Sequence, residues 1–107
     1  MIWKVSYLDT TVEREIAELP QDMQAKLRRI ADMIEQVGLS AMREPYIKHL
    51  QGKLWEMRLT GRDGLSRAIY VTMSGQRVVI VRAFRKKTQK TPRSEIELAL
   101  KWAEQVK

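Results

Sequence analysis

The amino-acid sequence predicts a small α+β domain with the element order β-α-α-β-β-β-α, in which the helices pack on one face of a mostly antiparallel, twisted sheet. Two observations support this fold class. Apolar residues recur at helical spacing in the first third of the chain, and from residue 54 onward they alternate or run continuously, as in strands. The 107 residues are 44% hydrophobic, which suffices for one core, so we expect a single domain over residues 1–107.

A strand and a helix are predicted at the start of the chain. Residues 2–7 alternate and are rich in β-forming side chains. Thr10 and Glu13 have the spacing of a capping box, which predicts Thr10 as the N-cap of the helix. Pro20 disfavours helical geometry in the residue before it, so this helix should end at Leu19.

A second helix is predicted to begin at Pro20, because proline suits the first turn of a helix. Gly38 is a natural stop for it. Its apolar positions are spaced three and four residues apart and predict one buried stripe, formed by Met23, Leu27, Ile30, Ile34 and Val37.

Three strands and a last helix are predicted in the second half. Residues 54–59 and 66–72 alternate, whereas residues 77–84 are almost continuously apolar and should lie inside the sheet with both faces covered. Short glycine-containing connections between them predict an antiparallel meander. Thr91 and Pro92 then predict the N-cap and first turn of a final helix.

The charge of the chain is segregated along its length. Lysine and arginine exceed aspartate and glutamate by seven, and no acidic residue occurs between Gly64 and Ser94. A surface kept soluble by lysine is the simple explanation, but solubility does not require such segregation. A concentrated positive charge attracts polyanions, so we expect a nucleic-acid or ribosome partner.

Several classes of function are excluded or disfavoured. The chain has no cysteine, which excludes disulfides, thiolate metal sites and cysteine nucleophiles. His49 is the only histidine, so we expect no metal site and no role for it in catalysis. We expect no small-molecule cofactor, because neither standard glycine-rich phosphate loop is present. No signal peptide or membrane-spanning segment is recognisable, and we expect a cytoplasmic protein.

Charged side chains gather on one predicted strand face, opposite the face that carries Trp55. Glu56 and Arg58 share this face, and antiparallel pairing brings Arg67 to it from the next strand. A charged strand face must meet solvent or a ligand, and its charges are nearly all positive, which favours a ligand. Arginines could bind a phosphate, and a lysine crowded by other cations, Lys86 or Lys87, could exchange protons. Glu56 could act as a base or pair with an arginine.

Three segments carry a family resemblance: residues 48–58 (KHLQGKLWEMR), 67–71 (RAIYV) and 83–92 (AFRKKTQKTP). Together they resemble the phage-associated, HigB-like branch of the RelE/ParE toxin superfamily, over essentially the whole chain. The resemblance implies a type II toxin, an mRNA endoribonuclease that acts on the ribosome and is neutralised by a cognate antitoxin protein.

The charged strand face and the resemblance together give the expected site residues. The expected catalytic residues are Arg58, Arg67, Lys86 and Glu56. The expected RNA-binding residues are Lys48, Lys53, Arg62, Arg82, Arg85, Lys87 and Lys90. RelE itself has a lysine where this chain has Glu56, so the identity of the general acid and base stays open. Two alternatives also stay open: a ParE-like inhibitor of DNA gyrase without nuclease activity, and a non-catalytic RNA-binding module.

Overall fold

The computed structural model describes residues 3–42, 46–85 and 90–106. Within these residues the chain forms five strands, three α-helices and one short 3₁₀ helix. In chain order they are β1 (Lys4–Tyr7), α1 (Thr10–Ala17), α2 (Gln21–Val37), η1 (Leu39–Ala41), β2 (Ile47–Gln51), β3 (Leu54–Gly61), β4 (Gly64–Met73), β5 (Arg77–Arg85) and α3 (Arg93–Ala103). None of the described helices is long and apolar enough to cross a membrane.

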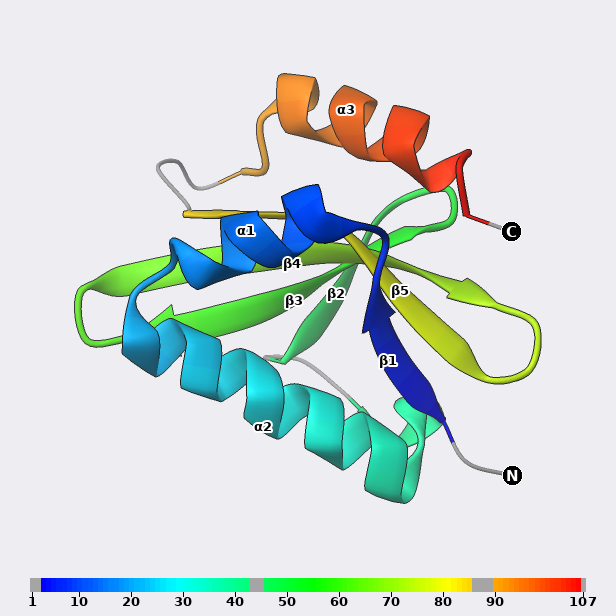
Figure 1. The fold of residues 1–107 in the computed structure, drawn as a ribbon, viewed down its shortest axis with the longest axis horizontal. Coiled ribbons are helices and arrows are strands. Elements are labelled where there is room, and N and C mark those ends of the chain that lie inside the picture. The colour runs from blue at the N-terminus through cyan, green and yellow to red at the C-terminus, as the bar shows by residue number, and fades with distance from the viewer. Residues whose placement is uncertain (1–2, 43–45, 86–89, 107) are drawn as a thin grey trace.

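The strands form one mixed sheet in the order β1-β5-β4-β3-β2 (Figure 1). β1 pairs with β5 in parallel and every other pairing is antiparallel, which confirms the α+β class and the predicted meander of β3, β4 and β5. β2 was not predicted. It is an edge strand whose middle residues Lys48 and His49 are exposed, so its sequence lacks the apolar alternation of a half-buried strand.

The helices cover both faces of the sheet, so the prediction that they pack on one face is wrong. α1 and α2 pack against one face, where Tyr70 and Ile80 contribute to the larger apolar cluster. α3 packs against the other face, over Ile69 and Val81, and lies on the opposite side of the strands from α2 in Figure 1. Helices are needed on both faces because the central residues of β4 and β5 are buried on both sides of the sheet. For β5, the continuous apolar run had predicted this burial.

The ends of α1 and α2 refine the predicted boundaries. The N-cap of α1 is Asp9, not Thr10: the Asp9 carboxylate accepts a hydrogen bond from the backbone N–H of Val12 at 3.1 Å. α1 ends at Ala17, before the predicted Leu19. Gly38 ends α2 as predicted and has a φ of 89°, which glycine adopts without strain. The buried stripe of α2 stops at Ile34, because Val37 is 62% exposed.

The cap of α1 provides a first test of the structure. We expect Asp9→Ala to lower the free energy of unfolding by about 1 kcal/mol, because it removes the partner of a helix N-terminal N–H. Thr10→Ala, the matched control, changes an exposed hydroxyl that does not cap the helix, and its effect should stay within about 0.5 kcal/mol. Urea denaturation measures both, and a larger loss for Thr10→Ala would restore the capping box predicted from the sequence.

Candidate active site

A buried ion pair lies between β3 and β4, on the sheet face that α3 covers. Arg67 Nη1 donates to both carboxylate oxygens of Glu56, at 2.6 and 2.8 Å. Arg67 is 5% exposed and Glu56 is completely buried. The alternative that Glu56 pairs with an arginine is therefore confirmed, and its partner is Arg67.

Thr91 completes this cluster from the segment that leads into α3. Its hydroxyl donates to Glu56 Oε2 at 3.0 Å and accepts from Arg67 Nη1. The residue predicted as an N-cap therefore does not cap α3; Pro92 occupies that position, without a side-chain cap. Each of these three residues is hydrogen-bonded to the other two, and we call Glu56, Arg67 and Thr91 the buried cluster.

The burial of this cluster corrects one expectation about Arg67. From the sequence, the strand face that carries Arg67 was expected to meet solvent or a ligand. Its partner Glu56 is fully buried, and an unpaired buried carboxylate is strongly destabilising. Arg67 must therefore be regarded as part of the core as well as of the candidate site.

Two further cations border the buried cluster. Arg58 on β3 lies directly opposite Arg67 on β4 and is partly exposed. Lys48 on β2 lies opposite Glu56 and is exposed. Residues that face each other across strands project to the same side of a sheet, so both cations share the face of the cluster. Lys90, also exposed, directly precedes Thr91.

The remaining predicted cations do not form one patch. Lys53 precedes β3 and Arg62 follows it, so they lie at opposite ends of an eight-residue strand, about 26 Å long. Arg85 is exposed, and its Nη2 donates to the carbonyl of Asp63 in the β3–β4 turn. Lys86 and Lys87 lie outside the described residues.

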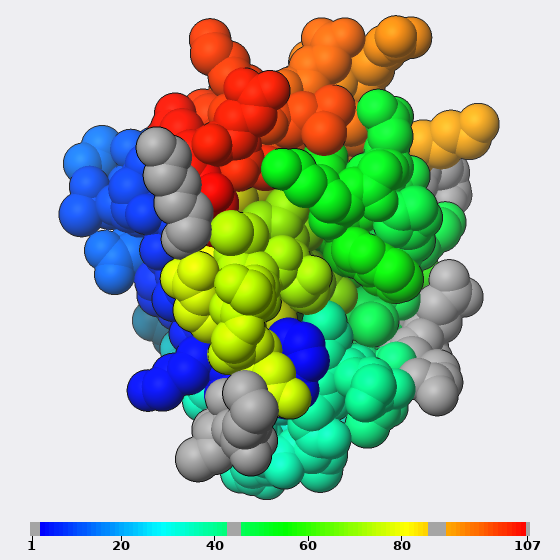
Figure 2. Space-filling view, turned by 90° about the vertical axis from the view of Figure 1, so that its right-hand side faces the viewer, coloured from blue at the N-terminus to red at the C-terminus, as the bar shows by residue number. Residues whose placement is uncertain are grey.

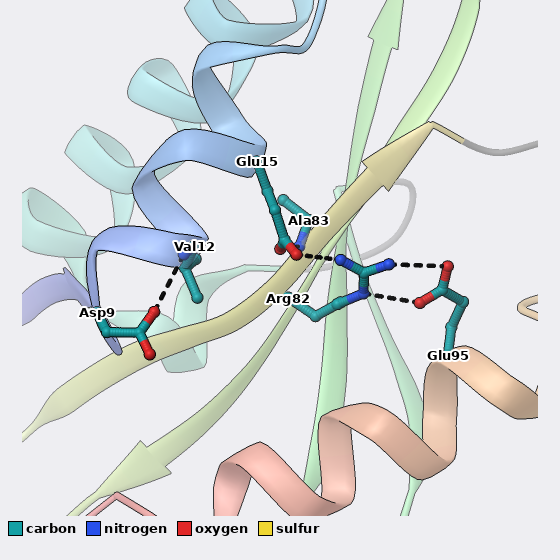
Figure 3. Close-up of polar contacts among 6 residues, drawn as sticks. All are labelled: Asp9, Val12, Glu15, Arg82, Ala83 and Glu95. Carbon is teal, nitrogen blue, oxygen red and sulfur yellow. Dashed lines mark hydrogen bonds and ion pairs between the residues drawn. The ribbon is translucent and has the colours of Figure 1, made fainter.

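Arg82, which the sequence predicted as an RNA-binding residue, is engaged in ion pairs within the fold. It lies between α1 and α3 and pairs with Glu15 on one side and Glu95 on the other (Figure 3). Its guanidinium carbon also lies 5.7 Å from the ring centroids of both Phe84 and Trp102. The sequence held no local indication of this bridge, because its two carboxylates come from elements 67 and 13 residues away.

Glu15 has a second role at this bridge. Its Oε1 accepts the backbone N–H of Ala83 at 3.0 Å, and so satisfies a donor of β5 (Figure 3). Burial raises the pKa of Glu15, while the hydrogen bond from Ala83 and the charge of Arg82 act against this increase.

His49 lies apart from the buried cluster. Its partner across β2 and β3 is Trp55, and this pair faces the α1–α2 side of the sheet. The imidazole Nε2 lies 2.7 Å from the carbonyl of Gly52. Among the described residues no group of His, Asp or Glu side chains is placed to hold a metal ion. Arg58 and Lys48, which border the buried cluster, instead offer accessible cations that can bind and polarise an anion such as a phosphate.

Comparison with solved structures identifies the fold. The chain matches the archaeal RelE–RelB complex from Pyrococcus horikoshii OT3 with a TM-score of 0.59 and 21% identity, over 81% of this chain and 98% of that one. It matches the YoeB–YefM complex from Staphylococcus aureus with a TM-score of 0.56 and 10% identity, over 80% and 99%. The protein therefore has the RelE-like fold that the sequence resemblance implied.

Comparison with family models identifies the family. Residues 14–104 match the family described as Phage derived protein Gp49-like (DUF891), and the chain belongs to this family. No curated protein sequence matches the chain significantly. The predicted resemblance to the phage-associated branch of the superfamily is thus confirmed at the level of family and fold.

The buried cluster leads to a prediction about stability. We expect Arg67→Met to destabilise the protein by about 3–5 kcal/mol, because Glu56 would remain buried without its partner. The double variant Glu56→Leu/Arg67→Met should recover most of this loss, since it removes both charges and keeps apolar volume. Urea denaturation of the two variants and the wild type measures the difference. A mild effect of Arg67→Met would mean that Glu56 is solvated in solution.

The Arg82 bridge predicts a pH-dependent effect. Arg82→Gln removes the charge that lowers the pKa of Glu15, so this pKa should rise further above its value in the unfolded chain. A carboxyl group whose pKa is higher in the folded than in the unfolded chain binds its proton more tightly when folded. Its protonation therefore stabilises the folded state at low pH, and this stabilisation is lost as the pH rises. The variant should therefore lose about 1–3 kcal/mol at pH 7 and less at about pH 5.

Arg93→Gln is the matched control for this experiment. Arg93 pairs with Glu97 on the exposed side of the same helix that carries Glu95, and both side chains are largely in solvent. Its replacement should change stability little at either pH. Equal losses for Arg82→Gln at the two pH values would contradict the role assigned to Glu15.

Proposed function

We propose that this protein is the toxin of a type II toxin–antitoxin pair, and that it cleaves mRNA on the ribosome. The observation that carries the proposal is the position of Arg58, which borders the buried Glu56–Arg67 ion pair on a face whose neighbouring cations are Lys48 and Lys90. The fold supports it, since the RelE and YoeB structures are complexes with RelB and YefM. A cognate antitoxin is the partner proposed on the same basis.

The chemistry requires a cation fixed where negative charge develops. Attack of a ribose 2′-hydroxyl on the adjacent phosphate concentrates charge on the phosphate oxygens, and preorganised donors stabilise that charge. Arg58 is the accessible phosphate ligand in this proposal, and Arg67 contributes through its small exposed edge. Arginine presents several donors in a rigid fork but does not transfer protons, so both act as clamps.

Glu56 acts in this proposal as an orienting residue for Arg67. Its two oxygens are both engaged, by Arg67 and Thr91, and it is completely buried. A base must reach the proton that it abstracts, which this placement does not favour. Proton exchange is assigned to Lys86, and charge neutralisation to Lys87, the next residue in the chain. This assignment rests on the sequence alone, on the crowding of these lysines by other cations and on the family resemblance.

Primer extension on a defined mRNA in a purified translation system tests the proposal. Wild-type protein should produce cuts only when ribosomes are present. Arg58→Ala should reduce the cleavage rate by about 100-fold or more, because it removes a donor to the charged phosphate. Arg28→Ala removes the same charge from an exposed position on α2, across the sheet from the buried cluster, and should leave the rate unchanged.

Three results would contradict parts of this proposal. An uncut message together with trapped DNA gyrase would favour a ParE-like inhibitor. Equal cleavage without ribosomes would remove the ribosome from the mechanism. Equal cleavage by Arg58→Ala and wild type, with both folded by circular dichroism, would place the active site elsewhere.

A further inference from the structure

A row of three side chains runs across β3, β4 and β5 and includes Arg67 of the buried cluster. Arg58 on β3, Arg67 on β4 and Phe84 on β5 lie opposite one another in consecutive strand pairings. We call these three residues the cross-strand row. Residues paired across strands project to the same side of a sheet, so Phe84 shares the face of the two arginines. The backbones of Arg58 and Phe84 are two strand spacings apart, about 10 Å.

A β-bulge in β5 sets the direction of Phe84. Consecutive residues of β4 pair with Ile80 and Arg82, so Val81 is an extra residue in β5. Val81 and Arg82 therefore both face α3: Val81 belongs to the apolar cluster there, and Arg82 pairs with Glu95. Strict alternation from Val81 would instead turn Phe84 toward α1 and α2. The bulge thus aims Phe84 at the face of the candidate site, a use of bulges that is common beside active sites.

Phe84 lies past the start of the helix that covers this face. α3 covers the sheet toward the β4–β5 turn, and Figure 2, which looks at that end of the molecule, shows the red end of α3 above the yellow-green atoms of this hairpin. The first turn of α3 reaches Arg82 through Glu95, and Phe84 is two residues further along β5, about 7 Å away. Phe84 and Arg58 are both partly exposed, whereas Arg67 between them is turned into the buried cluster.

The two exposed ends of the cross-strand row suit two parts of a nucleic-acid strand. Arg58 offers a rigid fork of donors for phosphate oxygens. The ring of Phe84 has no polar atom, and it offers a flat surface on which another ring can stack. Cations combined with an aromatic ring on one face are the usual means of binding a single nucleic-acid strand, because every base has a flat face. A strand with a phosphate at Arg58 therefore brings a neighbouring base to Phe84.

We propose that Phe84 is a stacking platform for one base of the RNA strand whose phosphate Arg58 binds. This inference rests on the proposed function, which places an RNA phosphate at Arg58, and it adds the residue that holds the adjoining base. Stacking on a phenyl ring uses no hydrogen bonds, so the site should accept all four bases. Phe84 positions the strand in this scheme, while Arg58 binds its charge.

NMR spectroscopy of the full-length protein observes this residue directly. Phe84 is the only phenylalanine in the chain, so isotope labelling of phenylalanine rings gives signals from Phe84 alone. The probe is a short single-stranded oligonucleotide with 2′-O-methyl riboses, which cannot be cleaved because the attacking hydroxyl is blocked. A base stacked on the ring should shift its signals upfield in a saturable way. An abasic strand with the same sugar–phosphate backbone should leave them nearly unchanged.

Fluorescence anisotropy of the two labelled strands measures the contribution of the bases to affinity. Wild-type protein should bind the base-containing strand about tenfold more tightly than the abasic strand, the value of one stacked base. Phe84→Leu keeps apolar volume without the ring and should bind both strands nearly equally, whereas Phe84→Tyr should keep the preference. Tyr7→Leu, the matched control, removes a more exposed ring that pairs with Ile80 on the α1–α2 face, and it should also keep the preference. Thermal denaturation checks that each variant folds.

The stacking site and the nuclease activity can fail separately, because the uncleavable strand measures binding alone. A preference for bases that Phe84→Leu abolishes would support the stacking site, even if the message stays uncut on ribosomes. Ribosome-dependent cleavage with equal wild-type affinities for the two strands would overturn the stacking site and leave the nuclease standing. An undiminished preference in Phe84→Leu, or an unshifted Phe84 signal, would overturn it as well. Equal affinities for the strands together with weaker antitoxin binding by Phe84→Leu would assign the ring to a protein interface instead.

Discussion

The buried ion pair between Glu56 and Arg67 constrains more of this structure than any other contact. Two charges removed from water are tolerated only where geometry and further hydrogen bonds compensate their desolvation. The pair therefore requires the observed register of β3 and β4, because a slip of one residue would turn Arg67 toward α2. It also fixes Thr91, and with it the point where α3 begins.

The two faces of the sheet carry different kinds of side chain. On the α3 face, Arg58 and Lys48 border the buried cluster and suit an anionic group. On the α1–α2 face, His49 and Trp55 are aromatic neighbours across β2 and β3. Alternation along β3 produces this division, since Glu56 and Arg58 point one way and Trp55 the other. Arg82 connects the two helical layers, because it pairs with Glu15 of α1 and with Glu95 of α3.

Local patterns predicted the elements well and their tertiary surroundings poorly. The stripe of α2 and the apolar run of β5 are periodic over many residues, so their structure follows from burial alone. Asp9 and Thr10 are both good caps, and only the backbone geometry selects between them. The charged face was identified correctly, but the burial of Arg67 was not, because it depends on α3 crossing to that face. The ion pairs of Arg82 could not be predicted either, because both of its carboxylates are distant in sequence.

The parallel pairing of β1 has a consequence for the order in which the molecule assembles. Lys4 pairs with Arg77, 73 residues later in the chain, and β1 has no other partner strand among the described residues. Contacts so distant in sequence form slowly, because a long loop must close first. We therefore expect the β3–β4 hairpin, whose strands are neighbours in the chain, to form before β1 pairs with β5. During synthesis β1 leaves the ribosome long before β5 exists, so the first strand of the chain is expected to join the sheet near the end.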